Sequence, residues 1–432
     1  MATISDGSIP TPPASTPPIG SRATGANFHR LWLGQGISLL GSATTAILMP
    51  LLAIQHLDAG PGWMGALTAA TWLPWLVIGL PAGAWVDRLP PRRVMITANL
   101  AAGAAVLTIP LAWWAGVLSL VQMLAVALAC GTATVFFHAA YAKLIPLIVP
   151  GPQLESANAR LFGTESAAQI AGPGVGGVLT QLLSAVVGIV GDAVSFVVSA
   201  ICLARIRLEP APTAVAKPSA ARLGAQIREG VRVVVRDRNL RVLVVLGSIS
   251  NFGLTGYAAL LVLFLVRDLH LSPGALGLVL MVGSAGGLLG ASLATGLARR
   301  IGTGRASTAL LLVSGPPALL IGSPSGPGQV WLTVTGLLLV GAAVVAGNVI
   351  RGAWRQRYVP GHLMGRVLTT SQVLNYGTMP LAGVAAGWLG THLGTQTTIL
   401  LMAGVHCLAC WSILLTRLGR LRNLPDWDAS QR

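Results

Sequence analysis

A chain of 432 residues with 53% hydrophobic and only 9% charged residues is not an ordinary soluble domain, in which roughly a quarter of the residues are charged. The formal net charge of +16 does not indicate nucleic-acid binding, because the basic residues fill the gaps between apolar runs instead of gathering on one polar face. The composition therefore predicts an all-α membrane protein, with no nucleic acid among its partners.

In chain order, residues 1–26 are rich in Pro, Ser, Thr and Gly, and we expect a disordered tail. Because a membrane-spanning helix needs about 20 apolar residues, the apolar runs predict twelve transmembrane helices. They begin near Leu31, Trp63, Val94, Leu118, Phe162, Ala185, Leu240, Gly274, Ala306, Val330, Thr369 and Thr397. Residues 181–190 nearly merge two spans, and Gly188 with Gly191 is the predicted break.

The middle of the chain divides the spans into two sets of six, residues 27–206 and 241–417. Residues 207–240 predict a linker with a basic amphipathic helix that lies on anionic lipid at the cytoplasmic interface, and recognition of a partner is the alternative. Its apolar face is formed by Leu223, Ile227, Val231 and Val235. Residues 418–432 form a second expected tail.

The basic residues predict the orientation of the chain in the membrane. Of the 28 Lys and Arg residues, only Arg267 falls in a connection that would face outward if the N-terminus is cytoplasmic. The positive-inside rule therefore places both termini in the cytoplasm. Such a multi-pass protein would sit in a bacterial plasma membrane, in contact with its lipid, and we expect a monomer.

One loop, between the second and third apolar runs, carries a distinctive motif. It contains Gly83, Asp87, Arg88, Arg92 and Arg93, and the chain reverses direction there within a few residues. This pattern resembles the loop between helices 2 and 3 of the major facilitator superfamily. The resemblance implies two pseudo-symmetric six-helix bundles that hold a substrate between them near mid-membrane.

The same resemblance implies a gating role for the loop. Asp87 would close an inner gate by meeting the positive N-terminal end of helix 11, near Thr369 and Thr370. Lys143 is the basic residue of helix 4 available beside it. The alternative is that Asp87 is a solvated loop residue.

The second motif lies in helix 5 and contains Gly172, Pro173, Gly176 and Gly177. Glycines four residues apart allow another helix to approach closely, and proline allows a bend. In exporters of the superfamily a similar stretch is associated with antiport, and it packs against the other half. Ordinary close packing is the alternative.

Longer stretches resemble the branch that contains macrolide-efflux proteins and enterobactin-type siderophore exporters. They are residues 28–38, 139–146, 155–159, 359–360 and 365–367. The chain departs from relatives in having Ser42 where many carry an acid, and no Arg within 120–141. The resemblance implies proton-coupled export of small hydrophobic solutes, such as macrolides. An endogenous siderophore or secondary metabolite is the alternative cargo, and a non-transporting sensor or scaffold is the alternative of another class.

Only Asp192 in helix 6 and Glu165 in helix 5 are candidate carboxylates for proton coupling. An acid at mid-span costs roughly 2.5–3.5 kcal/mol, so it should face a cavity or a partner. Asp192 is either a proton carrier or a hydrogen-bonded structural acid. Glu165 lies nearer the cytoplasm, where an interfacial role is the alternative.

Scattered polar and aromatic residues on otherwise apolar helices are candidates for lining the substrate cavity. They are Gln35, Trp72, His138, Asn251, Tyr257, Asn375 and Tyr376. Because such a cavity would carry few charges, it would favour a large, mostly apolar solute. The sequence contains no phosphate-binding loop for ATP and no zinc or nucleophile constellation, so we expect no cofactor, no metal and no enzymatic activity.

Overall fold

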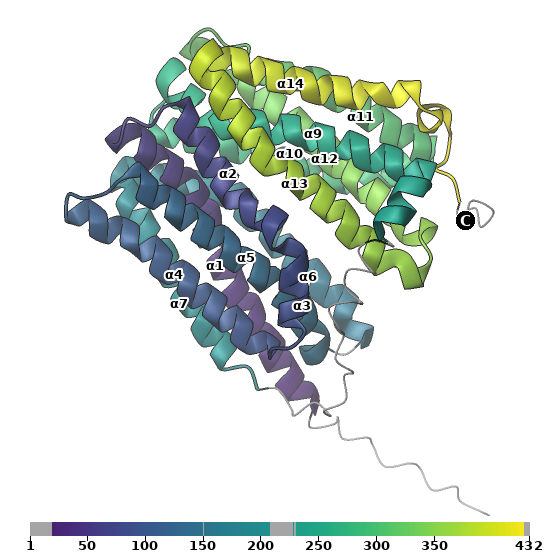
Figure 1. Ribbon diagram of the computed structural model, residues 1–432, viewed down its shortest axis with the longest axis horizontal. Helices are drawn as coiled ribbons and strands as arrows, with labels where there is room; N and C mark the ends of the chain where they lie inside the picture. Colours follow the sequence, from purple (N-terminus) through teal and green to yellow (C-terminus); the bar gives the residue numbers. More distant parts are fainter. Residues whose placement is uncertain (1–19, 150, 208–227, 229, 427–432) are drawn as a thin grey trace, which may run out of the picture.

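The computed structural model describes residues 20–149, 151–207, 228 and 230–426. Within these ranges the chain is helical and contains no β-strand. Twelve long helices form two bundles of six, which confirms the predicted fold class. Figure 1 shows the two bundles side by side, the first from purple to teal and the second from teal-green to yellow.

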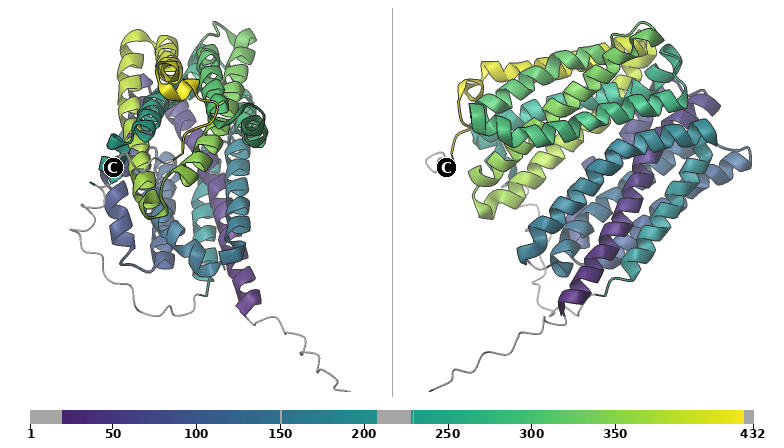
Figure 2. Two further views of the ribbon diagram at one scale, coloured as in Figure 1. Left: turned by 90° about the vertical axis from the view of Figure 1, so that its right-hand side faces the viewer. Right: turned by 180° about the vertical axis from the view of Figure 1, so that it is seen from behind.

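The first bundle consists of seven helical segments, because its second span is broken. They are α1 (Gly20–His56), α2 (Pro61–Val77), α3 (Gly79–Val86), α4 (Pro91–Trp114), α5 (Leu120–Ile148), α6 (Leu154–Leu182) and α7 (Ala185–Ala204). Proline occupies a first-turn position of α2 and of α4, where its missing N–H is not needed. The side chain of Ser119 caps α5 by accepting a hydrogen bond from the Gln122 N–H. In Figure 2, α1 lies between α6 and α7, and it packs on both.

The second bundle repeats this arrangement with six helices. They are α9 (Arg238–Leu263), α10 (Pro273–Ile301), α11 (Thr303–Ile321), α12 (Val330–Tyr358), α13 (Gly361–Leu393) and α14 (Thr395–Trp411). Short segments connect or follow the long helices: η1 (Gly151–Gln153), η2 (Phe264–Asp268), η3 (Pro327–Gln329), η4 (Ser412–Leu415) and η5 (Arg417–Arg420). The carboxylate of Asp237 caps α9 by accepting from the Leu240 N–H at 2.8 Å.

Nine of the described helical spans are long and apolar enough to cross a membrane on length and composition alone. The remaining three fall short for visible reasons. The segment α2 is only 17 residues long because the helix breaks at Ile78. In α6 and α13 the mean hydropathy is lowered by Gly, Ser, Thr and Gln residues. These helices are held by close packing with neighbouring helices, which compensates for a weaker hydrophobic signal.

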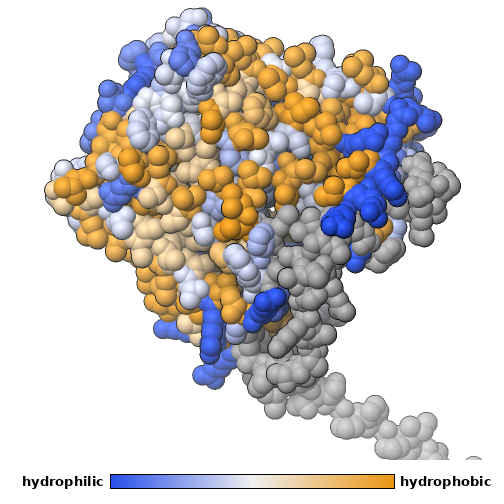
Figure 3. All heavy atoms as spheres, in the orientation of Figure 1, coloured by the Kyte–Doolittle hydropathy of each residue, from blue (hydrophilic) through white to orange (hydrophobic). Residues whose placement is uncertain are grey.

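The outer surface of the molecule is apolar, as a lipid environment requires. Figure 3 shows hydrophobic residues over the flanks of the bundles and hydrophilic residues gathered toward the ends. Exposed tryptophans mark both ends of the apolar zone, Trp114 and Trp331 at one end and Trp85 and Trp411 at the other. Tryptophan in these positions is typical of the two membrane–water interfaces.

We call the end that carries the loop 87–90 the basic end, and the end that carries residues 57–60 and 264–272 the opposite end. Between the bundles, α2 packs on α13 and α6 packs on α10. Figure 1 shows that the bundles lie together at the opposite end and splay apart toward the basic end.

Four boundaries differ from the sequence-based expectation. The helix α1 begins at Gly20, within the predicted tail. Near its start, the Asn27 side chain donates to the Arg207 carbonyl and the Arg30 side chain donates to the Arg205 carbonyl, both just after α7. The predicted break at Gly188 and Gly191 is wrong. Both glycines lie inside α7, and the chain turns at 183–184, where Ser184 caps α7 by accepting from the Val187 N–H.

The second predicted span is broken at Ile78, after Pro74, which the apolar run did not indicate. The final segment also differs, because part of it is docked on the second bundle. The indole of Trp354 donates to the Pro425 carbonyl at 2.8 Å, and the Thr303 N–H donates to Asn423. Residues 1–19 and 427–432 of the expected tails lie outside the described residues.

Most of the predicted linker also lies outside the described residues, including Leu223 and Ile227. Residues 230–236 are helical. Val231 and Val235 of the predicted apolar face are exposed, whereas Val234 is buried in the second bundle.

Candidate functional site

Two cavities lie at different depths along the molecule. The first, of about 390 Å³, is formed mainly by α1, α2, α5 and α7 of the first bundle and α9 of the second, and lies toward the opposite end. The second, of about 330 Å³, lies within the second bundle between α9, α11, α12, α13 and α14, toward the basic end. Together they offer room for solute on both sides of the middle of the molecule. We call them the first and second cavities.

Asp192 lines the first cavity and is 2% exposed. The Ser195 hydroxyl donates to its carboxylate at 3.1 Å, and the hydroxyl-bearing residues Ser42 and Thr45 line the same space. No described Lys or Arg forms an ion pair with Asp192. The site is thus a polar pocket around one buried acid.

The backbone of α1 comes so close to Asp192 that any side chain at position 41 would have to displace Asp192 and Ser195. A Cβ atom there would lie 2.5 Å from the carboxylate Oδ1 and from the Ser195 hydroxyl. Gly41 therefore allows α1 and α7 to enclose the acid.

Glu165 on α6 is half-buried and forms no ion pair among the described residues. It lies in the half of α6 that begins at the basic end, whereas Asp192 lies in the half of α7 that begins at the opposite end.

An aromatic cluster joins the bundles between the two cavities. The ring centroids of Trp72 and Tyr376 are 5.5 Å apart, and those of Trp75 and Tyr376 are 5.0 Å apart. His138 lies against Trp75 at 5.6 Å. Trp72 lines the first cavity and Tyr376 the second, so their contact forms part of the wall between the cavities. Sequence reasoning selected three of these residues and missed Trp75.

The second cavity contains the predicted residues Asn251 and Asn375. The Ser248 hydroxyl donates to Asn375 at 3.2 Å. A buried His406 pairs with the Ser250 hydroxyl at 2.9 Å in the same cavity wall. These groups make the wall polar in a helix bundle that is otherwise apolar.

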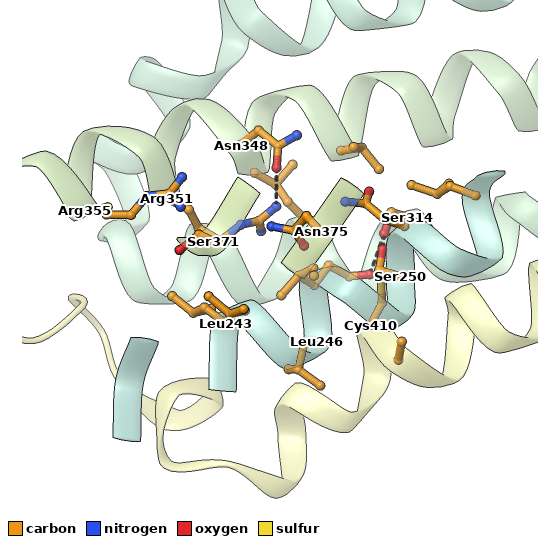
Figure 4. Close-up of a pocket in the computed structure, with 18 of the residues that line it drawn as sticks. Leu243, Leu246, Ser250, Ser314, Asn348, Arg351, Arg355, Ser371, Asn375 and Cys410 are labelled. Atoms are coloured by element: carbon orange, nitrogen blue, oxygen red, sulfur yellow. Dashed lines mark hydrogen bonds between the residues drawn. The ribbon is translucent and has the colours of Figure 1, made fainter. Parts of the chain in front are cut away.

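Two arginines of α12, Arg351 and Arg355, also line the second cavity, and sequence reasoning did not select them (Figure 4). Both lie in the last two turns of their helix, where Arg usually marks the interface. The one feature of the sequence that could have identified Arg351 as a cavity residue was its distance from the helix end at Tyr358.

Three of the predicted cavity residues line neither cavity, and one of them is His138, which packs against Trp75. Tyr257 is 6% exposed and packs in the hydrophobic core, because its position on α9 faces the neighbouring helices of the bundle. Gln35 lines neither cavity, and its side-chain oxygen is buried without a hydrogen-bond partner among the described residues.

The loop motif lies at the basic end, between α3 and α4. The Lys143 ammonium is 3.6 Å from the Asp87 carboxylate and donates to the Asp87 carbonyl at 2.9 Å. Arg92 donates to the Ile206 carbonyl at the end of α7. Among the described residues, no hydrogen bond or ion pair joins Asp87 to Thr369 or Thr370. The predicted meeting of Asp87 with helix 11 is therefore absent from this conformation, in which the bundles splay apart at the basic end (Figure 1).

The glycine motif of α6 contacts a neighbouring helix on each of two faces. On one face, a Cβ at Gly172 would lie 2.9 Å from the carbonyl carbon of Ala43, so the motif packs on α1 of its own bundle. On the other, a Cβ at Gly177 would lie 2.6 Å from the Pro273 carbonyl oxygen of α10. The motif therefore holds a close seam between the bundles at the opposite end.

Two polar contacts reinforce the opposite end. Asp58 and Arg267 form an ion pair from one bundle to the other, and the Gln181 side chain accepts from the Gly274 N–H at 3.1 Å. The sequence analysis did not single out Asp58, which the fold brings to Arg267.

No group of three or more His, Cys, Asp and Glu residues in the described part of the chain is arranged to hold a metal ion.

Comparison with known proteins places these features in a family. A family model described as the Major Facilitator Superfamily matches residues 31–383. The chain is 30% identical over 397 residues to the "Multidrug efflux pump Tap" of Mycobacterium tuberculosis, covering 89% of this chain and 91% of the relative. It is 24% identical over 419 residues to the "Macrolide efflux protein A" of Streptococcus pyogenes, covering 92% and 97%.

Solved structures agree on the fold. The nucleoside transporter NupG superposes with a TM-score of 0.71 at 12% identity, covering 90% of this chain and 98% of that one. A bacterial homologue of the iron transporter ferroportin, in an inward-facing state, superposes with a TM-score of 0.68 at 16% identity, covering 89% and 98%. The twelve-helix fold, the paired bundles and the matching family model agree, and the chain belongs to the Major Facilitator Superfamily of multi-pass membrane transporters.

Proposed function

We propose that this transporter is a proton-coupled exporter that moves hydrophobic compounds, such as macrolides, out of a bacterial cell. Two efflux proteins, of Mycobacterium tuberculosis and Streptococcus pyogenes, support this direction of transport. The aromatic cluster and the mostly apolar walls of the first cavity suit a large apolar solute.

The observation that carries proton coupling is the environment of Asp192. A buried carboxylate without a cationic partner costs free energy when it is ionised, so it gains by taking up a proton. Its place on a cavity wall gives that proton a path to water when the cavity opens. Glu165, half-buried on α6, is the second candidate for the carrier.

Alternating access supplies the mechanism. The basic end, with its Arg and Lys residues, faces the cytoplasm under the positive-inside rule, so both termini are cytoplasmic and this conformation is open to the cytoplasm. Residues 27–206 would rock against residues 241–417, opening the seams at the opposite end and closing the basic end. Asp87 would then meet the start of α13. We expect a monomer in the bacterial plasma membrane, with the linker helix on its lipid.

The experiment measures accumulation of labelled macrolides and lipophilic dyes in efflux-deficient cells. Cells would express wild type, Asp192→Asn or the control Glu155→Gln, each with and without a protonophore. Glu155 is an exposed acid at the start of α6. Wild type and the control should lower accumulation, and both the protonophore and Asp192→Asn should abolish that effect.

Export that survives in Asp192→Asn would contradict the assignment of the carrier and make Glu165→Gln the next variant. Unchanged accumulation of every compound with wild type would contradict drug export and favour an endogenous siderophore or secondary metabolite as cargo.

A further inference from the structure

The second cavity is lined by two arginines whose positive charge has no role in the proposed export of apolar solutes. Arg351 and Arg355 are one turn apart on α12 and both line it (Figure 4). Among the described residues neither arginine forms a salt bridge. The Arg355 Nε is buried and has no hydrogen-bond partner in that part of the chain.

The side chain of Arg351 is directed away from the basic end. A Cβ atom at Gly347, one turn further into the membrane, would lie 2.8 Å from Nη1 and 2.9 Å from Nη2 of Arg351. The guanidinium therefore lies over Gly347 and points toward the middle of the molecule. An arginine this close to a helix end usually extends toward the nearest polar interface instead.

Among the described residues, the hydrogen-bond partners of Arg351 are neutral. It donates to the Asn348 side chain at 3.0 Å and to the Ser307 hydroxyl at 3.5 Å. These contacts position the guanidinium without neutralising it. A cation held within a membrane protein is costly unless an anion accompanies it.

We infer that the second cavity binds the anionic group of an amphipathic molecule, a carboxylate, phosphate or sulfate, through Arg351 and Arg355. Planar guanidinium groups bind such oxyanions with paired hydrogen bonds. Leu243, Leu246 and Leu311 line the same cavity and supply an apolar surface for the rest of the molecule.

Two sources share this chemistry, a transported solute with an acidic group and the headgroup of an anionic phospholipid. Assigning the group to a transported solute rests on the proposed export function, whereas the anion site itself does not.

The test measures equilibrium binding to the full-length protein in phosphatidylcholine nanodiscs. The probes are the fluorescent carboxylate dansylglycine and its neutral amide. Wild type should bind the carboxylate about ten- to a hundredfold more tightly than the amide, as a charge-assisted contact predicts. Arg351→Gln and Arg355→Gln should lose this preference and keep their binding of the amide.

Arg357→Gln is the matched control, because Arg357 lies on the same helix but is exposed. It should keep the preference of wild type. If Arg351→Gln does not fold, as judged by size exclusion and thermal unfolding, Gly347→Ala provides the second variant. It retains both charges and displaces only the Arg351 guanidinium, and it should reduce the preference severalfold.

Equal binding of both probes by wild type would overturn the inference, as would a preference that survives in both Arg351→Gln and Arg355→Gln.

Repeating the titration with phosphatidylglycerol in the nanodiscs separates the sources. Competition in wild type but not in Arg351→Gln identifies a lipid headgroup, and absence of competition identifies a soluble anion. Carboxylate preference without cellular export would contradict the proposed function alone, and export without this preference would contradict the anion site alone.

Discussion

Gly177 of α6 and Gly277 of α10 are in direct backbone contact across the two bundles. A Cβ atom on either glycine would lie 2.8 Å from the Cα of the other, a distance that real side chains do not tolerate. On the other seam, a Cβ at Gly65 of α2 would lie 2.6 Å from the Cα of Gly387 on α13. Both seams lie at the opposite end, so the present conformation depends on the absence of side chains there.

Replacement of Gly177 or Gly277 by alanine should disfavour this conformation. Overpacking a tight contact costs about 1–3 kcal/mol, which shifts a two-state equilibrium by about five- to 150-fold. We expect spin labels on the two bundles at the opposite end to move apart in electron–electron distance measurements. Gly163→Ala, on the same helix but with nothing within 4 Å of its Cβ, should leave the distances unchanged. Unaltered distances in Gly177→Ala would show that the seam does not hold the bundles together.

The ion pair between Asp58 and Arg267 should add a small contribution to the same closure. The Asp58 side chain is 96% exposed, and an exposed pair contributes about 0–1 kcal/mol. Asp58→Asn should therefore shift the spin-label distances slightly, and less at high salt. The charge-reversed double variant Asp58→Arg, Arg267→Asp should recover the wild-type distribution, and a failure to recover would argue against a direct pair.

The contact between Trp72 and Tyr376 should separate the two cavities. Aromatic pairs contribute about 0.5–1.5 kcal/mol beyond buried area, so Tyr376→Ala should weaken binding of an aromatic solute about two- to tenfold. Tyr376→Phe keeps the ring and should bind as wild type does. Equal loss in both variants, measured by fluorescence titration, would place the effect on the hydroxyl instead.

Asp87→Asn should leave the folded, splayed conformation intact but slow transport. Among the described residues the carboxylate forms one ion pair, with Lys143 at 3.6 Å between exposed groups, so little stability is lost. The proposed closed state requires the carboxylate charge at the start of α13. Thermal unfolding should be unchanged and the efflux rate several times lower, whereas an efflux rate equal to that of wild type would contradict the gating role.

The sequence predicted the helical framework well because apolar length is a strong signal. The starts expected near Val94, Ala185 and Val330 lie within three residues of those observed. It failed at 183–184, where the chain turns and Ser184 caps the start of α7 instead of a glycine pair breaking the run, and at Ile78, where α2 breaks inside one apolar run.

The site was less predictable, because side-chain direction depends on packing. Asp192 and Tyr376 were selected as isolated polar residues in apolar runs, and both line a cavity. Tyr257 has the same local pattern but faces the core. Arg351 was missed because its sequence position is that of an interfacial arginine, and only the contact with Gly347 shows that it points inward.

The most direct test of the central claim uses purified protein in liposomes with an imposed pH gradient. Solute movement and proton movement would be recorded together for wild type and Asp192→Asn. We predict that solute moves against its gradient only with wild type and only while protons flow the other way, whereas Asp192→Asn binds solute but moves neither. Solute movement in Asp192→Asn that still follows the pH gradient would contradict the account.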